Sequence, residues 1–403
     1  MSNLISLPKP EWTSGLIKTS AGCAHGNLFN ACHALRSDPE LQLLLAYNVF
    51  SMKPEIVRAP PWDFEHDAFT QRDWSPSDDL LLTEYLQGIG IPLKPQTTTQ
   101  AVDLVARERQ YHPVVDYLDS LEWDGKPRLD QWLTDYVGAV ETPYTQSIGR
   151  AALIGAVARI RHPGCKVDTV PIIEGDQGIG KSSAARAMFE PWFTDEIADL
   201  GNKDASMQTQ GVWLIEISEL DAMSRGEVSK TKAFVSRTTD RYRPPYGARL
   251  VETNRSCVFW GTTNSDTYLK DETGGRRFWP IKASKIDIPG LKAARDQLWA
   301  EADRLHRNGA AWWLVNPEAV RIAEGEQTAR YQTDPWDDPI AEHLKTVGDV
   351  SVAEILRDVL HLEISRWGQA EQNRVARCLK ARRLVRYQTR TGDKRGWRYR
   401  MVG

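Results

Sequence analysis

Several features that mark particular classes of protein are missing from this sequence. The chain has five cysteines, an odd number, and no C-x-x-C pair, which argues against a disulfide framework and fits a reducing cytosol. No apolar run reaches the roughly 18 residues that a membrane span needs. The N-terminus has no basic-then-apolar signal pattern, and no internal repeat or low-complexity tract occurs. We therefore expect a soluble, cytoplasmic protein with no membrane partner.

A metal centre near the N-terminus is not expected either. Four side chains that can bind metals lie close together there: Cys23, His25, Cys32 and His33. Their spacing matches no common structural zinc pattern, so free thiols are the better interpretation of the two cysteines.

Excess charge of one sign is absent from the chain as a whole but not from its end. The net charge is −3 over 403 residues, so any nucleic-acid surface must come from local patches. From Arg366 onward, twelve Lys or Arg stand against two acids, Glu371 and Asp393. Such an excess favours a polyanionic partner, and a solvated basic face is the alternative.

The first 165 residues are dominated by helical patterns. Apolar residues recur at helical spacing in Asn27–Ala46 and Tyr144–Ile160, while the Pro-rich stretch Lys53–Asp63 is typical of a loop or hinge. We interpret residues 1–165 as a helical N-terminal domain and a candidate oligomerisation collar.

The rest of the chain has two further segments. Within residues 166–330, β-branched apolar runs occur at Val167–Glu174, Val212–Ile217 and Cys257–Thr262, with helical patterns between them. Strands that alternate with helices indicate a parallel α/β core. An Asp- and Pro-rich linker then leads to a small basic module at residues 340–403.

The most specific motif is a glycine-rich loop after the first of these strands. Residues 175–182 read Gly-Asp-Gln-Gly-Ile-Gly-Lys-Ser and fit G-x-x-x-x-G-K-[ST] completely. Glycines let consecutive backbone N–H groups face inward as an anion nest, and the following helix directs its positive end to the same place. In such a loop Lys181 binds the β- and γ-phosphates of ATP, and the Ser182 hydroxyl binds Mg²⁺. The predicted nucleotide-binding residues are Gly175, Asp176, Gln177, Gly178, Ile179, Gly180, Lys181, Ser182 and Ser183.

Two acids follow the second strand pattern, in the run VWLIEISEL. A carboxylate at a strand end beside the phosphates holds the Mg²⁺ shell or orients the attacking water. If the strand continues past Ile217, Glu216 and Glu219 point to opposite faces, whereas an early turn lets both line the site. We favour both at the site, with Glu216 as metal ligand and Glu219 as base or water-orienting residue. The alternative is that Glu219 only caps the next helix.

Polar residues beyond the third strand complete the predicted catalytic set. Asn264 ends the run CVFWGTTN, where its amide is placed to sense the γ-phosphate. Arg276 and Arg277 follow a Gly-Gly turn and suit an arginine finger, because a guanidinium binds phosphate oxygens bidentately and keeps its charge. The alternative for the two arginines is a solvated or acid-paired surface pair.

In this order, the motifs resemble the virulence-associated protein E family. These are phage- and prophage-encoded P-loop proteins similar to superfamily 3 helicases of the AAA+ class. The resemblance covers about residues 110–315 and rests on the segments WDGKPRLDQWLTDY, HPGCKVDTVPIIEG, GDQGIGKSS, QGVWLIEISEL, KAFVSRTTDRYRPPYG, VFWGTTN and LKDETGGRRFWPI. One departure is Glu-Ile-Ser-Glu, since typical superfamily 3 helicases have two adjacent acids.

The resemblance carries several implications for this chain. It implies an α/β P-loop NTPase fold that binds ATP and Mg²⁺ at Lys181 and Ser182. It also implies Asn264 as sensor, and Arg276 or Arg277 as a finger that acts on the neighbouring subunit. Superfamily 3 proteins typically form hexameric rings around DNA, so a homo-oligomer, most simply a hexamer, is the expected assembly.

Two basic segments are predicted to contact DNA. Lys230–Arg255 interleaves arginines with tyrosines around a Pro-Pro pair, and in superfamily 3 rings a β-hairpin at this place lines the pore around single-stranded DNA. A basic subunit interface is the alternative. The tail pattern of helix, helix and two short strands predicts a winged-helix-like module for duplex DNA. The candidate contacts are Lys232, Arg241, Arg243, Arg249, Arg374, Arg377 and Lys380.

Two functions stay open at this point. The first is an ATP-hydrolysing, ring-forming DNA translocase or helicase of phage or mobile-element replication, acting in the cytoplasm of a bacterial host. The second is an ATP-gated DNA-binding regulator or defence component that does not unwind DNA. A P-loop small-molecule kinase fits less well, because the arginine pair, the basic hairpin and the basic tail have no role in it. No primase-like constellation occurs, so a separate primase or initiator is an expected partner.

Overall fold

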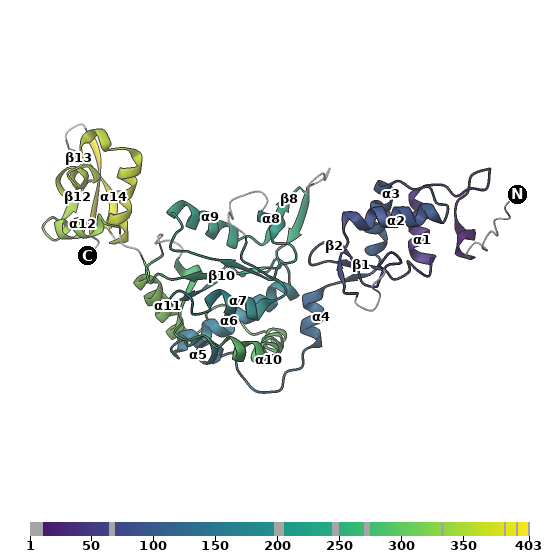
Figure 1. Ribbon diagram of the computed structural model, residues 1–403. Coiled ribbons are helices and arrows are strands. Elements are labelled where there is room, and N and C mark those ends of the chain that lie inside the picture. The colour runs from purple at the N-terminus through teal and green to yellow at the C-terminus, as the bar shows by residue number, and fades with distance from the viewer. Residues whose placement is uncertain are drawn as a thin grey trace.

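The chain forms three parts in sequence order, which Figure 1 shows as an N-terminal part, a central domain and a C-terminal module. The computed structural model describes residues 11–63, 69–196, 205–243, 250–269, 275–331, 334–382, 384–391 and 394–401. We call residues 11–111 the N-terminal part, 113–331 the central domain and 334–401 the C-terminal module. Each part has a hydrophobic core of its own. None of the helices in the described ranges combines the length and apolar character needed to cross a bilayer.

The N-terminal part combines three helices with a small sheet. The helices are α1 (Leu28–Ser37), α2 (Pro76–Gly88) and α3 (Pro95–Ala106). The strands are β1 (Leu45–Asn48), β2 (Lys53–Ile56), β3 (Arg72–Asp73) and β4 (Gln110–Tyr111). They pair in the order β3-β2-β1-β4, with β1 and β4 parallel and the other two pairs antiparallel.

This part is therefore not the purely helical domain that the sequence predicts. The helical pattern of residues 27–46 ends early because Asp38 precedes a proline and takes an extended conformation (φ −70°, ψ 123°) after α1. Leu41, Leu44 and Leu45 beyond it are buried as the pattern predicts, but Leu45 already begins β1. Pro54 lies inside β2 and pairs with Tyr47, in a stretch that composition alone indicated to be a loop.

The central domain is built on a five-stranded sheet whose described neighbour pairs are all parallel. Its strands are β5 (Val170–Glu174), β6 (Phe193–Thr194), β7 (Leu214–Ile217), β10 (Val258–Thr263) and β11 (Phe278–Lys282), in the order β11-β5-β10-β7-β6. The three strands predicted from apolar runs, β5, β10 and β7, lie side by side in its middle. The predicted parallel α/β core is confirmed.

Helices cover both faces of this sheet, because its strands are apolar on both sides. Phe259 of β10 packs in the core on the α9 (Arg225–Val235) side, whereas its neighbour Trp260 faces the opposite side. That side is covered by α6 (Pro143–Arg161), α7 (Lys181–Phe189) and α10 (Ile288–Arg307). The remaining helices of the domain are α4 (Pro113–Ser120), α5 (Trp132–Val137), α8 (Ala205–Gln208) and α11 (Pro317–Ala329).

A cluster of large aromatic rings fixes α7 against the sheet and α10. The tryptophan cluster consists of Phe189, Trp213, Trp260 and Trp299, whose rings lie between 4.3 and 5.2 Å apart where they pack directly. The Trp213 indole also donates a hydrogen bond to the carbonyl of Ala156 in α6, at 2.9 Å. Because α6 shares this core, the domain boundary predicted at residue 165 falls inside one packed unit.

A two-stranded hairpin projects from the central domain (Figure 1). It consists of β8 (Thr239–Tyr242) and β9 (Val251–Asn254), and its predicted Pro-Pro tip lies outside the described residues. At its base, Arg255 Nε donates to Asp240 Oδ2 at 2.8 Å, and both side chains are at most 1% exposed. The buried pair anchors the hairpin to α9, because the Arg255 guanidinium lies 4.3 Å from the Phe234 ring.

The C-terminal module folds as helix, strand, helices and hairpin. Its elements are α12 (Asp337–Leu344), β12 (Asp349–Val350), α13 (Val352–Glu354), α14 (Gln369–Ala381), β13 (Leu384–Thr391) and β14 (Lys394–Met401). The strands form an antiparallel sheet in the order β12-β14-β13. Helix α13 continues as a π-helical turn, Ile355–Val359. Helix α12 begins within the segment predicted as a linker, since Ile340 is fully buried in the core of the module.

Candidate active site

The glycine loop lies at the edge of the sheet where the central strands end. This loop, residues 175–182, follows β5 and leads directly into α7. Gly178 (φ 84°) and Gly180 (φ 97°) have left-handed backbone conformations that favour glycine. At Gly175 (φ 151°), a Cβ atom would lie 3.0 Å from the Ala283 carbonyl oxygen and 2.6 Å from Ile179 Cδ1, so a side chain would be strained there. The glycines thus permit the tight curl that the motif predicts.

Lys181 joins the glycine loop to the end of β10. Its Nζ donates hydrogen bonds of 2.8 Å to the carbonyls of Gly175 and Asp176 and to Oδ1 of Asn264. Burial lowers the pKa of Lys181, and nearby carboxylates, those of Asp176, Asp221 and Glu216, act in the opposite direction. The structure therefore places one ammonium group and the Asn264 amide against each other beneath the loop.

Glu216 lies in β7 and is 2% exposed. Its Oε1 accepts hydrogen bonds from the hydroxyls of Ser182 and Thr262, both at 2.6 Å. Its Oε2 is buried and has no hydrogen-bond partner among the described residues. A carboxylate with a spare oxygen beside a serine hydroxyl is the oxygen donor set that Mg²⁺ prefers, so these two residues fit that ion.

Glu219 lies beyond the end of β7, where the chain turns. It has a left-handed backbone conformation (φ 52°), which is rare for a residue with a side chain and concentrates at functional sites. Its exposed side chain lines the same cavity as the glycine loop. The cap of the next helix, α9, is Ser224, paired with Glu227. The turn therefore brings both predicted acids to the site and leaves no capping role for Glu219.

Three residues that the sequence interpretation missed support this site. Thr262 holds Glu216, as described above, and Thr263 Oγ1 donates to Asp221 Oδ1 at 2.8 Å. The signals were present in the sequence, since the threonines directly precede Asn264 and Asp221 is a third acid two residues after Glu219. A pair of hydroxyls at a strand end orients neighbouring carboxylates, much as outer partners orient metal ligands.

A cavity of about 360 Å³ opens over these groups. The glycine loop forms one wall, and Ser218, Glu219, Thr262, Thr263 and Asn264 form the other. Its size falls within the range of about 300–1,000 Å³ that small-molecule and cofactor sites occupy. The cavity thus gathers a glycine-rich backbone, an ammonium group, the Glu219 carboxylate and an amide around one space.

The predicted arginine finger is not part of this cluster. Arg276 and Arg277 lie in a short 3₁₀ turn just before β11. In the sheet, Phe278 pairs with Val170 and Lys282 with Glu174, so the arginines lie at the amino edge and the glycine loop at the carboxyl edge. Four residues of strand separate the two edges by about 13 Å.

Each arginine has different surroundings at that edge. Arg276 is exposed, whereas Arg277 is 23% exposed and its Nε lies 3.4 Å from Asp168 Oδ2. Asp168 directly precedes the entry into β5, so the ion pair keeps Arg277 against the amino edge of its own sheet.

The basic residues of the hairpin segment divide into exposed and buried ones. Arg241 is exposed and pairs with Glu252 at 2.7 Å, Arg243 is exposed, and Arg249 lies outside the described residues. Lys232 was wrongly predicted as a DNA contact: it is 8% exposed, and its Nζ lies 5.5 Å over the Phe278 ring. The reason is helical spacing, which places Lys232 on the same face of α9 as buried Val228.

The predicted DNA contacts of α14 also need one correction. Arg374 binds Asp334 with Nε and Nη2 at 2.7–2.9 Å and stacks 3.9 Å over the Trp336 ring, so it holds the module together rather than facing a ligand. Arg377 and Lys380 are exposed on the same helix, and neither forms an ion pair with any residue that the structure describes. The structure therefore leaves Arg377 and Lys380 as candidate DNA contacts.

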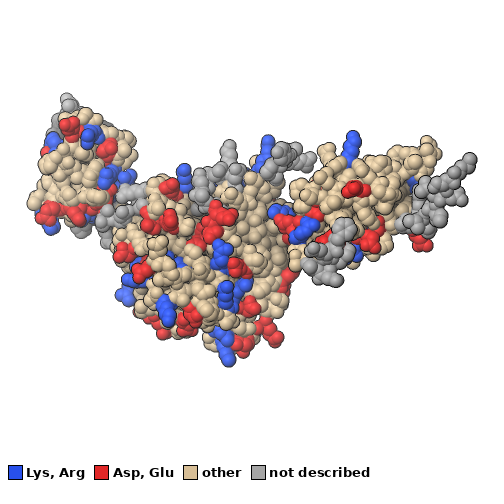
Figure 2. All heavy atoms as spheres, viewed as in Figure 1, with Lys and Arg blue, Asp and Glu red and all other residues tan. Residues whose placement is uncertain are grey.

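Charges of both signs are mixed over the face of the molecule that Figure 2 shows. Lys and Arg alternate with Asp and Glu over the central domain, without a single-sign patch on that face. Mixed charge of this kind matches the small net charge of −3.

The fold and the site together define a mixed α/β domain with a glycine-rich loop at the carboxyl edge of a parallel sheet. A family model described as the virulence-associated protein E-like domain matches residues 118–332, more than half of the chain, and the protein belongs to this family. The resemblance stated from the sequence motifs is confirmed.

Solved structures of one other protein are similar to this chain over most of its length. The apo structure of the NrS-1 C-terminal region (305–718) matches at 14% identity and a TM-score of 0.45, covering 89% of this chain and 96% of that chain. The A form apo structure of the same region matches at 11% identity and a TM-score of 0.46, covering 94% and 100%. A search of curated proteins gave no match.

The site generates a direct prediction for Lys181→Ala. We expect ATP hydrolysis to fall by about a hundred-fold or more, because the only ammonium group lining the described cavity is lost. Phosphate release measures the rate, and the thermal unfolding midpoint checks that the fold is intact. The matched control is Lys292→Ala, an exposed lysine on α10. Equal turnover in the two variants would contradict the assignment of the site.

Proposed function

We propose that the protein is an ATP-hydrolysing, ring-forming DNA translocase or helicase of phage or mobile-element replication. The observation that carries this proposal is the convergence of the glycine loop, Lys181, the Ser182–Glu216 pair and Asn264 at one edge of a parallel sheet. This convergence supports a P-loop NTPase, in which positioned donors and a metal stabilise the charge of a transferring phosphoryl group.

Each residue of the site has a role in this proposal. The backbone of residues 175–182 and Lys181 bind the phosphates of ATP. Ser182 and Glu216 hold Mg²⁺, which neutralises phosphate charge when bound. Glu219 accepts a proton from the attacking water or orients it, since its carboxylate faces the cavity from the exposed turn after β7. Asn264 contacts the γ-phosphate from the end of β10, the strand that lies between the other two.

The position of the arginine pair supports the proposed ring. About 13 Å of strand separates Arg277 from the sheet edge at which the glycine loop of its own chain begins, and the loop extends beyond that edge. A finger placed in this way acts on the site of a second copy, in a head-to-tail contact. Contacts of this type close into rings, and we propose a hexamer.

Two projecting elements are the proposed DNA contacts. The β8–β9 hairpin carries exposed Arg241 and Arg243 and faces single-stranded DNA in the pore. The C-terminal module has the order of helices and strands of a winged helix, with α14 as its recognition helix for duplex DNA. On the β13–β14 wing, the Arg386 guanidinium lies 4.0 Å over the Trp397 ring, which is 49% exposed and available for stacking.

ATP-dependent displacement of a labelled DNA strand is the experiment that tests this function. We expect the wild-type protein to displace the strand, with a solution mass of six subunits measured alongside by light scattering. Lys181→Ala should assemble but displace nothing. If the wild type hydrolyses ATP and binds duplex DNA but never separates strands, the ATP-gated regulator is the correct function instead.

A mixture of two inactive variants tests the head-to-tail ring. Arg277→Ala alone, or failing that Arg276→Ala, should lose about 10³–10⁵ in hydrolysis rate, because a finger supplies that much. Mixing Arg277→Ala with Lys181→Ala should restore part of the activity, since some interfaces then pair an intact loop with an intact finger. The control mixture combines Arg277→Ala with the double variant Lys181→Ala/Arg277→Ala and should stay inactive. A first mixture that stays inactive despite subunit exchange would contradict the trans-acting finger.

The salt dependence of duplex binding tests the C-terminal module. Arg377→Ala and Lys380→Ala should each weaken duplex binding and lower the slope of log affinity against log salt by about one, because each removes one phosphate contact. The measurement is fluorescence anisotropy with labelled duplex at several salt concentrations. Lys345→Ala, an exposed lysine paired with Glu342 in the same module, is the matched control and should leave the slope unchanged. Slopes equal to that of the control would exclude α14 as the DNA-binding helix.

A further inference from the structure

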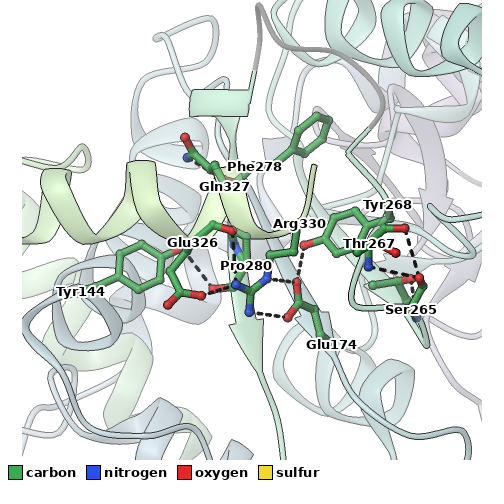
Figure 3. A network of polar contacts seen from close by, with 11 residues as sticks. Tyr144, Glu174, Ser265, Thr267, Tyr268, Phe278, Pro280, Glu326, Gln327 and Arg330 are labelled. Carbon is green, nitrogen blue, oxygen red and sulfur yellow. Dashed lines mark hydrogen bonds and ion pairs between the residues drawn. The ribbon is translucent and has the colours of Figure 1, made fainter. Parts of the chain in front are cut away.

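A second charged cluster lies directly behind the glycine loop, and it is not part of the catalytic set. Glu174 is the last residue of β5 and the neighbour of Gly175, and its side chain is 5% exposed. Arg330 donates to this carboxylate from Nε at 2.5 Å and from Nη2 at 2.7 Å, and Tyr268 Oη donates at 2.6 Å. Figure 3 shows the three side chains converging on one point. We call Glu174, Tyr268 and Arg330 the Glu174 cluster.

The cluster fixes the residue from which the glycine loop starts. Burial opposes the charge of Arg330, but the Glu174 carboxylate outweighs it and raises the pKa of the guanidinium. The Glu174 backbone is also held, because its carbonyl accepts a hydrogen bond from the Ala283 amide at 2.8 Å. A buried carboxylate with a bidentate partner has little freedom to move, so the first glycine of the loop is held in place from behind.

Arg330 holds a second segment of the site as well. Its backbone carbonyl accepts hydrogen bonds from the amides of Tyr268 at 3.1 Å and Leu269 at 3.0 Å. These two residues lie between Asn264 and the arginine pair along the chain. Arg330 thus connects the start of the glycine loop with the segment that follows Asn264.

The position of Arg330 itself is set by α11. It follows the last residue of this helix, and its Nη1 contacts the Glu326 carboxylate one turn earlier. Gln327 Nε2 donates to the carbonyl of Phe278 at 2.9 Å, which holds α11 against β11 (Figure 3). The guanidinium therefore reaches Glu174 from a helix that is fixed to the sheet.

The connection from Arg330 to the C-terminal module is short. Asp334, which is 5% exposed and accepts the Arg374 fork, already belongs to the module. Residues 331–333 separate these two fixed points, and four peptide steps reach at most about 14 Å when fully extended. Any larger displacement of the module must pull on Tyr331, which is bridged to Leu269 and directly follows Arg330.

We propose that Arg330 is a positioning residue that holds the glycine loop in place through Glu174. Through Arg330, the position of the C-terminal module then affects ATP binding at the loop. The proposal rests on the proposed function, because it assigns a role in nucleotide binding to a residue that touches no nucleotide. The loop binds the phosphates equally in the ground state and in the transition state. Loss of such binding raises KM and leaves kcat nearly unchanged, so a displaced loop should raise KM more than it lowers kcat.

Three single variants test the positioning role. Arg330→Lys keeps the charge beside Glu174 but loses the fork, and we expect the KM for ATP to rise about ten-fold with kcat within about three-fold of wild type. Tyr268→Phe removes one hydrogen bond, keeps the ion pair and should raise KM in the same direction by about three-fold. Glu324→Gln is the matched control, because Glu324 is an exposed acid on the same helix α11 with no role in holding Arg330, and the variant should leave KM within two-fold.

The outcomes separate this inference from the proposed function. A wild-type protein that neither binds nor hydrolyses ATP contradicts the proposed function. A wild-type protein that hydrolyses ATP, with Arg330→Lys and Tyr268→Phe indistinguishable from Glu324→Gln, overturns the positioning role alone. Thermal unfolding midpoints accompany each measurement, and if Arg330→Lys is unstable the decision rests on Tyr268→Phe.

A linker variant tests the connection to the module. Insertion of Gly-Ser-Gly-Ser between residues 332 and 333 leaves the Glu174 cluster and the module unchanged but adds slack between them. We expect duplex DNA to change the KM for ATP in the wild type by at least about five-fold, the lower end of typical coupling, and to have no effect on KM in the insertion variant. DNA affinity measured without ATP should be the same in both proteins. A KM that ignores DNA in the wild type, or responds equally in the variant, would overturn the coupling.

Discussion

The direction of the strands in the central sheet is the constraint on which the rest of this protein depends. Because all five run the same way, their carboxyl ends share one edge, and groups far apart in the sequence meet there. The glycine loop, the acids after β7 and the amide after β10 are gathered by that rule alone. The same rule sends Arg276 and Arg277, which precede β11, to the opposite edge. The glycine loop and the arginine pair thus lie at opposite edges of one sheet.

Three buried carboxylates of the central domain differ in their hydrogen-bond partners, and this difference separates structural acids from an acid of the candidate site. Asp240 at the hairpin base and Glu174 behind the glycine loop each bind one arginine, and both carboxylate oxygens accept hydrogen bonds from its guanidinium. Glu216 receives only hydroxyl hydrogen bonds, and one of its oxygens keeps no partner among the described residues. A charge neutralised by a guanidinium is structurally stable, whereas one held by hydroxyls retains capacity for a cation. The partner of each acid therefore indicates its role better than its burial does.

Whether a feature could be predicted from the sequence depends on how far apart in the sequence its interacting residues lie. The glycine loop and the strands β5, β7 and β10 depend on local patterns, and all were predicted near their actual positions. The early end of α1 depends on a single Asp-Pro step that the helical spacing of later leucines obscured.

The faces of charged helices were harder to predict because they depend on distant partners. Lys232 turned inward to meet Phe278, and Arg374 meets Asp334, which lies 40 residues away in the sequence. The Glu174–Arg330 pair spans 156 residues, and no local signal marks either member as half of a pair. Long-range charge pairing is therefore the part of this site that one sequence cannot supply.

The tryptophan cluster has a consequence for how this protein appears in polarised light. Two indoles that pack 4.3 Å apart with their planes tilted by 32°, as Trp213 and Trp299 do, share their excited states and rotate near-ultraviolet light strongly while they are held rigid. Phe189, at the end of the helix that begins with Lys181, completes that packing. Part of the near-ultraviolet circular dichroism of the central domain therefore reports on the helix under the glycine loop, without a label. That part of the signal is lost when the packing loosens.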